Sequence, residues 1–294
     1  MAKIIFMESK QMKWVYLTAL SLVWGSSFIL IKKGLIGLNP LQLGSLRIIF
    51  ASVFLLLIGF KSLPKIPASK WKYIALTSLF GTFLPAYLFA IAQTEIDSSI
   101  SSILNSLTPL NTLVLGALLF RLQFKRNQIF GILIGLAGSI LLVLNGAANH
   151  PEQNHYYAIL VLIASICYAL NVNLIKRHLH DLSPVSITTG NFTVLFIPAF
   201  LVLFFSGFFD VAQEVQVQKS VLFIIILGVV GTGIANILFF KLIQMSSPVF
   251  ATSVTYLIPV VAFGWGLLDN EALTPIQFFG AFIILIGVYL SAKK

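Results

Sequence analysis

The stretch Leu104–Phe120, LNSLTPLNTLVLGALLF, decides the fold of this chain. It is apolar enough to lie in a membrane, yet it carries Pro109 in its middle. Polar side chains surround this proline: Asn105, Ser106, Thr108, Asn111 and Thr112. Polar groups and a proline are unfavourable in a membrane span unless they face protein or water. The stretch therefore predicts a membrane helix with one side turned towards a polar interior.

A second stretch repeats the first at an offset of 150 residues. In residues 254–268, VTYLIPVVAFGWGLL, Pro259 takes the place of Pro109 and Gly266 the place of Gly116. Two polar, proline-interrupted spans at corresponding places in two halves of a chain indicate the binding site of a transporter.

The composition excludes a soluble protein. The chain has 294 residues, of which 58% are hydrophobic and 10% charged, and its mean hydropathy is +0.98. The lone Cys167 lies in an apolar run, so no disulfide framework is expected. The net charge of +10 would suggest a nucleic-acid partner in a soluble protein. Here the basic residues cluster at the ends of apolar runs, where they signal membrane topology, and no nucleic-acid partner is expected.

A membrane span needs roughly 20 apolar residues, and the chain offers ten such segments. Their approximate limits are 14–31, 41–60, 71–92, 98–119, 127–145, 156–175, 185–207, 220–242, 248–268 and 274–292. With the N-terminus in the cytoplasm, 15 of the 19 basic residues fall on the inner side and seven of the nine acidic ones outside. Both termini are therefore predicted to be cytoplasmic in a multi-pass protein of the inner (plasma) membrane.

The repeat extends over the whole chain. Gly81-Thr82 recurs as Gly231-Thr232 at the offset of 150, and Pro40 recurs as Pro184 at an offset of 144. Each half holds five predicted spans, and because five is odd the second half is inverted relative to the first. We expect an all-α membrane domain built from two inverted five-helix repeats, residues 1–145 and 146–294.

These features together resemble a known family. The motifs that carry the resemblance are Trp24-Gly25-Ser26-Ser27-Phe28, Arg47, the two prolines, and Glu271 before Gln277-x-x-Gly280. They resemble the EamA-like branch of the drug/metabolite transporter superfamily. The resemblance implies export or exchange of small metabolites, often amino acids or amphipathic compounds, through a central cavity between the halves. Arg121 stands where the first half would match Glu271, so the acidic signature is present only in the second copy.

Deep polar residues define a candidate binding site at the level of the membrane midplane. Trp24 and Tyr168 would supply aromatic faces. Hydrogen bonds would come from Ser27, Thr82, Asn105, Thr108, Asn171, Thr232 and Asn236, with Thr255 and Tyr256 approaching from the partner span. The alternative for each of these residues is a hydrogen bond between helices that serves only stability.

Three further residues have open roles. Pro109 and Pro259 are either hinges of alternating access or fixed kinks, and each leaves one backbone carbonyl without its helical donor. Arg47 is the only charged side chain well inside a predicted span. It either contacts substrate or serves structure by pairing or by reaching the headgroups. No Asp or Glu lies deep in a span, which favours a facilitator or a proton route without carboxylates.

Other classes of function find little support. The four histidines lie in predicted loops, and the sequence has no phosphate-binding loop, nucleophile elbow or His-Glu-x-x-His motif. We therefore expect no metal, no cofactor and no enzyme. The leading hypothesis is a secondary transporter that exports neutral or zwitterionic metabolites by alternating access across a lipid bilayer, as a monomer or homodimer. The alternatives are a transporter of nucleotide-sugars or phosphorylated sugars, which would need further deep cations, and a non-transporting membrane protein.

Overall fold

The computed structural model describes residues 2–96, 98–147, 155–268 and 275–292, and over these residues the chain is helical, without a strand. Glu271 of the family signature lies outside the described residues. Among the described helical segments, six are long and apolar enough to cross a membrane: Gln11–Gly34, Pro40–Lys65, Ala68–Ala92, Ala158–His178, Pro184–Phe205 and Val215–Met245. Three shorter apolar helices accompany them: Thr108–Phe120, Pro248–Val261 and Phe282–Ser291.

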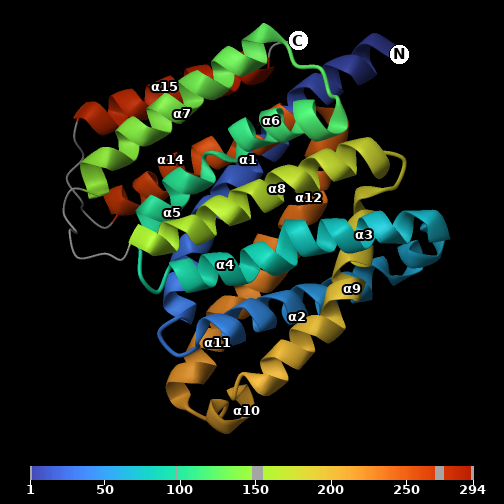
Figure 1. Ribbon diagram of the computed structural model, residues 1–294, viewed down its shortest axis with the longest axis vertical. Helices are drawn as coiled ribbons and strands as arrows, with labels where there is room; N and C mark the ends of the chain where they lie inside the picture. Colours follow the sequence, from blue (N-terminus) through green and yellow to red (C-terminus); the bar gives the residue numbers. More distant parts are fainter. Residues whose placement is uncertain (1, 97, 148–154, 269–274, 293–294) are drawn as a thin grey trace.

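Figure 1 shows the helices as a single bundle. In chain order they are α1 (Ala2–Gly34), α2 (Pro40–Gly59), η1 (Phe60–Lys65), η2 (Ala68–Lys70), α3 (Trp71–Ser78), η3 (Leu79–Phe83), α4 (Leu84–Ala92), α5 (Ser98–Asn105), α6 (Thr108–Phe120), α7 (Arg126–Ala147), η4 (His155–Tyr157), α8 (Ala158–His178), α9 (Pro184–Phe205), α10 (Phe208–Val211), α11 (Val215–Gly228), η5 (Val229–Ile234), α12 (Ala235–Met245), α13 (Pro248–Thr252), α14 (Val254–Leu268) and α15 (Pro275–Ala292).

Several helices begin at a proline that follows a polar cap. Asn39 precedes Pro40 of α2 and forms a reciprocal capping box with Gln42. Ser183 caps α9 before Pro184, and Ser247 caps α13 in the same way. A proline is favourable at this position because its missing N–H would have no helical acceptor, while the cap oxygen satisfies one of the exposed N–H groups. These local signals fix where the helices start.

Four of the segments predicted from hydropathy are interrupted helices. The segments 71–92 and 220–242 each contain a π-helical turn, η3 and η5. The segment 98–119 breaks between α5 and α6, next to Pro109, as its sequence suggests. The segment 248–268 breaks at Ser253 instead of at Pro259, because hydroxyl groups there bond to the backbone. Ser253 Oγ donates to the Phe250 carbonyl at 2.7 Å.

The helices of the two halves pack across one another. Helix α1 packs on α11, α12 and α14 of the second half, and α8 packs on α3, α4 and α6 of the first. Helix α2 packs along α9. The long helices α7 and α15 lie side by side at one edge of the bundle (Figure 1). Each half therefore completes its core only with the other.

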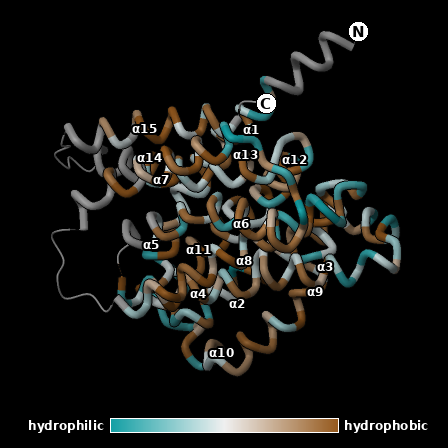
Figure 2. The backbone as a smooth tube through the Cα atoms, turned by 45° about the horizontal axis from the view of Figure 1, so that its top comes forward, coloured by the Kyte–Doolittle hydropathy of each residue, from teal (hydrophilic) through white to brown (hydrophobic). Residues whose placement is uncertain are grey.

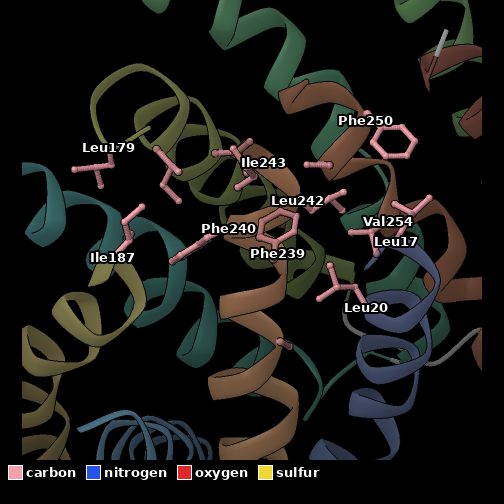
Figure 3. Packing of buried hydrophobic residues seen from close by; sticks show 14 of the residues in the cluster. Leu17, Leu20, Leu179, Ile187, Phe239, Phe240, Leu242, Ile243, Phe250 and Val254 are labelled. Atoms are coloured by element: carbon pink, nitrogen blue, oxygen red, sulfur yellow. The ribbon is translucent and has the colours of Figure 1, made fainter. Parts of the chain in front are cut away.

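Two clusters of buried apolar residues lie at different levels of the bundle. The large cluster includes Leu17 and Leu20 of α1 together with Phe240 and Ile243 of α12 (Figure 3). The small cluster includes Phe28, Phe89, Val161 and Ile258, among others. The outer surface is also apolar, because Leu57, Leu118 and Phe205 are among many large apolar side chains that are exposed. Figure 2 shows hydrophobic residues along most helices. An apolar exterior of this extent suits a protein surrounded by lipid.

Candidate functional site

A cavity lies between the two halves, at the level that separates the two apolar clusters. It encloses about 870 Å³ of space free of protein atoms, its open mouth included. On α1 the large cluster ends at Leu20 and the small one contains Phe28, with Trp24 and Ser27 of the cavity wall between them. Its lining of apolar and aromatic side chains with a few polar groups is typical of a site for a small molecule.

The structure gathers most of the sequence-predicted site residues around this one cavity. Ten of the eleven residues proposed to bind substrate line it: Trp24, Ser27, Thr82, Asn105, Thr108, Tyr168, Asn171, Thr232, Asn236 and Thr255. Arg47 lines it as well. Residues from sequence positions as distant as Trp24 and Thr255 thus meet in one place.

Tyr256 is placed elsewhere and does not belong to the lining. It is fully buried, and its hydroxyl donates to the Ile132 carbonyl of α7 at 3.0 Å. Successive residues of a helix point about 100° apart, so when Thr255 faces the cavity its neighbour faces α7. Its ring fills the space beside Gly135. Tyr256 therefore ties α14 to α7.

The two prolines also lie outside the lining, and protein hydroxyls satisfy the carbonyls that they leave without a helical donor. For Pro109 that carbonyl belongs to Asn105, which accepts from Thr108 Oγ1 at 2.6 Å. For Pro259 it belongs to Thr255, which at 3.3 Å shares the Ser106 hydroxyl with the Ser102 carbonyl at 2.9 Å. Neither carbonyl needs a substrate to be hydrogen-bonded.

The cavity also has an apolar lining, which the sequence alone did not predict. Phe28, Ile31, Phe89 and Phe239 face the cavity. In the sequence these residues look like those of a core or a lipid-facing surface, because apolar side chains are expected throughout a membrane helix. The one available signal was helical spacing, since Phe28 and Ile31 follow Trp24 by four and seven residues.

The π-helical turn η5 builds one wall of the cavity. A π-turn holds one extra residue, so some of its carbonyls leave the regular helical pattern and accept other donors. Trp24 Nε1 donates to the Gly231 carbonyl at 3.0 Å, and Asn236 Nδ2 donates to that of Thr232 at 2.9 Å. Thr232 Oγ1 closes the turn by donating to the Leu227 carbonyl at 3.0 Å. The turn therefore places Thr232 in the cavity wall, and its carbonyls hold Trp24 of α1 and Asn236 of α12 beside it.

The glycines of the two π-turns allow close approach of a helix from the other half. A β-carbon at Gly81 would lie 2.6 Å from the Asn171 side chain, and one at Gly231 would lie 3.0 Å from Ser27 Oγ. Ser27 and Asn171 are themselves equivalent under the offset of 144. The same contact, a π-turn glycine against a polar residue of the opposite half, thus occurs twice.

Aromatic rings line the cavity on the sides of both apolar clusters, with Phe239 from the large cluster and Phe28 and Phe89 from the small one. Trp24 packs edge-on against Phe239 with ring centres 4.9 Å apart. Phe89 lies between Phe28 and Tyr168, with centroid distances of 6.3 and 6.0 Å. These distances are typical of favourable aromatic pairs. The rings give the cavity a large apolar wall.

Arg47 is held within the cavity wall. Its Nε donates to Thr232 Oγ1 at 2.7 Å, across the boundary between the two halves. Among the described residues, the one ion pair joins Lys70 to Asp181, at a distance from the cavity. The bond to Thr232 fits the structural alternative, in which Arg47 pairs with a neighbouring helix, and contact with a substrate stays a prediction. Arg47 is the one charged side chain among the described residues that line the cavity.

A polar contact near the large cluster joins the end of η2 to the end of α8 and the loop that follows it. Lys70 Nζ donates to Asp181 Oδ1 at 2.9 Å and to the His178 carbonyl at 2.6 Å. The hydrogen bond from Lys70 lowers the pKa of Asp181 below its ordinary value. Tyr73 stacks on the His178 ring with centroids 4.0 Å apart. Within the described part of the chain, no group of three His, Cys, Asp or Glu residues could hold a metal ion.

The sequence is similar to known transporters over most of its length. The model of the EamA-like transporter family matches the chain twice, over residues 12–144 and 155–293. An uncharacterized inner membrane transporter of Escherichia coli, YedA, is 30% identical over 286 residues, covering 93% of this chain and 88% of that protein. A probable amino-acid metabolite efflux pump of Salmonella typhimurium is 27% identical over 92% of this chain and 91% of its own length.

Two further relatives extend the comparison. An S-adenosylmethionine/S-adenosylhomocysteine transporter of Chlamydia muridarum is 23% identical over 97% of this chain and 92% of that protein. A crystal structure with 15% sequence identity superposes with a TM-score of 0.73 over 94% of each chain, a likeness that concerns the fold alone. With the family model covering nearly all of the sequence, the chain belongs to the EamA-like transporter family, and it is a multi-pass membrane transporter.

Proposed function

We propose that this protein exports or exchanges small neutral or zwitterionic metabolites, amino acids or amphipathic compounds, by alternating access at the cavity between its halves. The observation that carries the proposal is the lining itself. Aromatic rings, hydroxyl and amide groups and a single cation from both halves surround one cavity at the level of the π-turns. Such a site suits a small molecule with an apolar body and few charges.

The proposed architecture is ten membrane spans in two inverted repeats, with both termini in the cytoplasm of a cell whose inner membrane holds the protein. Three observations support it. The π-turns η3 and η5 occur at the offset of 150, and the family model matches each half separately. The contacts of α1 with the second half also mirror those of α8 with the first. Inverted repeats of this kind place their substrate site where the repeats meet.

Alternating access requires that the cavity open to one side while the other is closed. The large cluster lies on the side of the N-terminal part of α1, which the charge distribution places in the cytoplasm. The small cluster, with Phe28, Phe89 and Ile258, closes the opposite side. Separation of one cluster while the other stays packed would expose the cavity to each compartment in turn.

The named relatives support the substrate class. An amino-acid metabolite efflux pump and an S-adenosylmethionine/S-adenosylhomocysteine transporter both handle compounds with amino-acid parts. A phosphorylated sugar would need several cationic groups around its phosphates. The described lining of this cavity contains one, Arg47, so the nucleotide-sugar alternative is less well supported.

Flux measurements on purified protein in proteoliposomes test the proposal. We expect faster flux of at least one compound from a panel of amino acids and amphipathic metabolites. Trp24→Ala should slow this flux while the variant inserts and folds normally. Leu22→Ala, on the same helix but exposed on the outside of the bundle, is the matched control and should retain flux. Equal flux through protein-free and protein-containing vesicles for the whole panel would refute the proposed function.

A further inference from the structure

We propose that Arg47 is the carboxylate-binding residue of the cavity, so that the substrate is a carboxylate with an apolar body. The inference rests on the proposed function, because it assumes that the cavity is the transport site. It adds a requirement that the function alone does not contain: compounds of the same shape without a carboxylate should bind poorly.

Arg47 is a cation in a cavity whose other described lining residues are uncharged. Arg47 stays protonated at any physiological pH, and no carboxylate stands among the described residues that line the cavity. A cation removed from water without a partner is costly, and a bound anion removes that cost. Because the remaining described lining is uncharged, a single carboxylate makes the occupied cavity neutral.

The guanidinium of Arg47 is held at one of its three nitrogens. Arg47 uses its Nε–H on Thr232 Oγ1 at 2.7 Å, and the hydrogen bond from Thr232 to the Leu227 carbonyl fixes that hydroxyl in turn. The two terminal amino groups of the guanidinium make no further hydrogen bond to the described residues. A planar fork with its stem held in place is the arrangement that binds a carboxylate through two parallel hydrogen bonds.

Several other donors of the cavity are already bonded to backbone carbonyls. The hydroxyl hydrogens of Ser27, Thr108 and Thr255 are directed to backbone carbonyls three or four residues earlier in the chain, at 2.9, 2.6 and 2.9 Å. The indole N–H of Trp24 is bonded to Gly231. The remaining donors are neutral, and they belong to Thr82, Asn105, Tyr168 and Asn171. Arg47 therefore carries the only charged donors of the described lining, and charged donors form the stronger hydrogen bonds.

The charge of Arg47 has no counterpart at the corresponding position in the second half of the chain. At the offset of 144 that relates Pro40 to Pro184, Arg47 corresponds to Asn191 of α9. Asn191 is buried and bonds with the Thr77 hydroxyl at 2.9 Å, and it does not line the cavity. A neutral residue therefore suffices for packing at this position of the repeat. The charge breaks the symmetry at the cavity, which is where a ligand would require it.

A ligand series tests the inference on the unaltered protein. The probes are L-phenylalanine, 3-phenylpropionate, L-phenylalaninamide and 2-phenylethylamine, which share one ring and differ in their polar groups. Binding is measured by ligand-induced thermal stabilisation and by quenching of tryptophan fluorescence in detergent micelles. We expect the two carboxylates to bind at least about tenfold more tightly than the amide and the amine, as for a charge-assisted bidentate pair.

Variants then assign the preference to Arg47. Arg47→Asn introduces the residue of the other repeat and should bring the ratio of acid to amide affinity close to one. Arg47→Lys should retain part of the preference, because it keeps the charge without the fork. Arg177→Asn, at an exposed position at the end of α8, is the control and should leave the ratio unchanged.

Three results would overturn the inference: equal binding of acid and amide by the unaltered protein, absence of binding by both carboxylates, or a full carboxylate preference in Arg47→Asn. The ligand series on the unaltered protein decides the matter even if Arg47→Asn does not fold. Flux separates this inference from the proposed function. Transport of the amide and the acid at equal rates would refute the role of Arg47 and leave the transporter intact, whereas absence of flux for every compound would refute the proposed function.

Discussion

The contact between α7 and α15 offers a sharp test of the fold, because it joins backbone to backbone. A β-carbon at Gly287 would lie 2.4 Å from the Gly135 nitrogen and 2.7 Å from the Gly131 carbonyl oxygen. Ordinary van der Waals contacts begin near 3.4 Å. The atoms in the way belong to the main chain and cannot rotate aside. Gly287→Ala therefore requires the two helices to separate by about 1 Å.

The cost of this separation follows from packing. A gap of about 1 Å removes a quarter to a half of the dispersion energy of the contacts that it opens. Overpacked interiors typically lose 1–3 kcal/mol. We expect Gly287→Ala to lower the free energy of unfolding by about 2 kcal/mol, which corresponds to a decrease of roughly 4–8 °C in Tm.

Thermal unfolding of the purified protein in one detergent measures the effect. Leu285→Ala, on the same helix at a half-exposed position facing outward, is the control and should change Tm by less. A Gly287→Ala variant as stable as the original would show that the backbones are not in contact. A stable variant with an altered oligomeric state would instead indicate that the glycine face of α7, with Gly131 and Gly135, contacts a second copy of the chain.

Two further predictions concern polar contacts. The bond to Lys70 lowers the pKa of Asp181, so this ion pair should stabilise the folded protein at pH values above the ordinary carboxyl pKa. The stabilisation should disappear as pH falls through the lowered pKa. When Tm is measured against pH, Asp181→Asn should lose this decrease of Tm in acid, whereas Asp210→Asn should retain it. Ser106→Ala should cost about 0.6–1.7 kcal/mol because it removes the donor to the carbonyl left free by Pro259. Pro259→Ala restores a helical N–H, so the double variant should lose less stability than the two single changes added together.

The sequence predicts this fold and much of this site because polar groups are exceptional in a membrane. Each deep Ser, Thr or Asn has to face protein or water, so residues such as Thr82 and Asn236 can be assigned to the interior without a structure. The predicted repeat pairs Gly81-Thr82 with Gly231-Thr232, and both stretches form π-helical turns in the structure. Apolar residues carry no such signal, which is why Phe28 and Phe239 were not identified.

Direction around a helix is harder to predict than depth. Tyr256 lies at the expected level, but it faces α7 because its neighbour Thr255 already faces the cavity. Pro259 suggested the break in its span, yet the helix is interrupted at Ser253, where side-chain hydroxyls compete for backbone carbonyls. A difference of one residue, or of one local hydrogen bond, decides such cases, and hydropathy does not detect it.

Polar residues of the cavity combine two roles that were considered as alternatives above, hydrogen bonding that stabilises the protein and contact with the cavity. The hydroxyls of Thr108 and Thr255 do serve structure, since their hydrogens bond to backbone carbonyls, and both residues nevertheless line the cavity. With the hydrogens engaged, their oxygens remain available only as acceptors. Such acceptors suit an ammonium or hydroxyl group of a ligand, while the fork of Arg47 suits its carboxylate. The aromatic wall imposes no directional hydrogen bond, so we expect the transporter to tolerate many apolar side chains and to be strict about the charged end of its substrate.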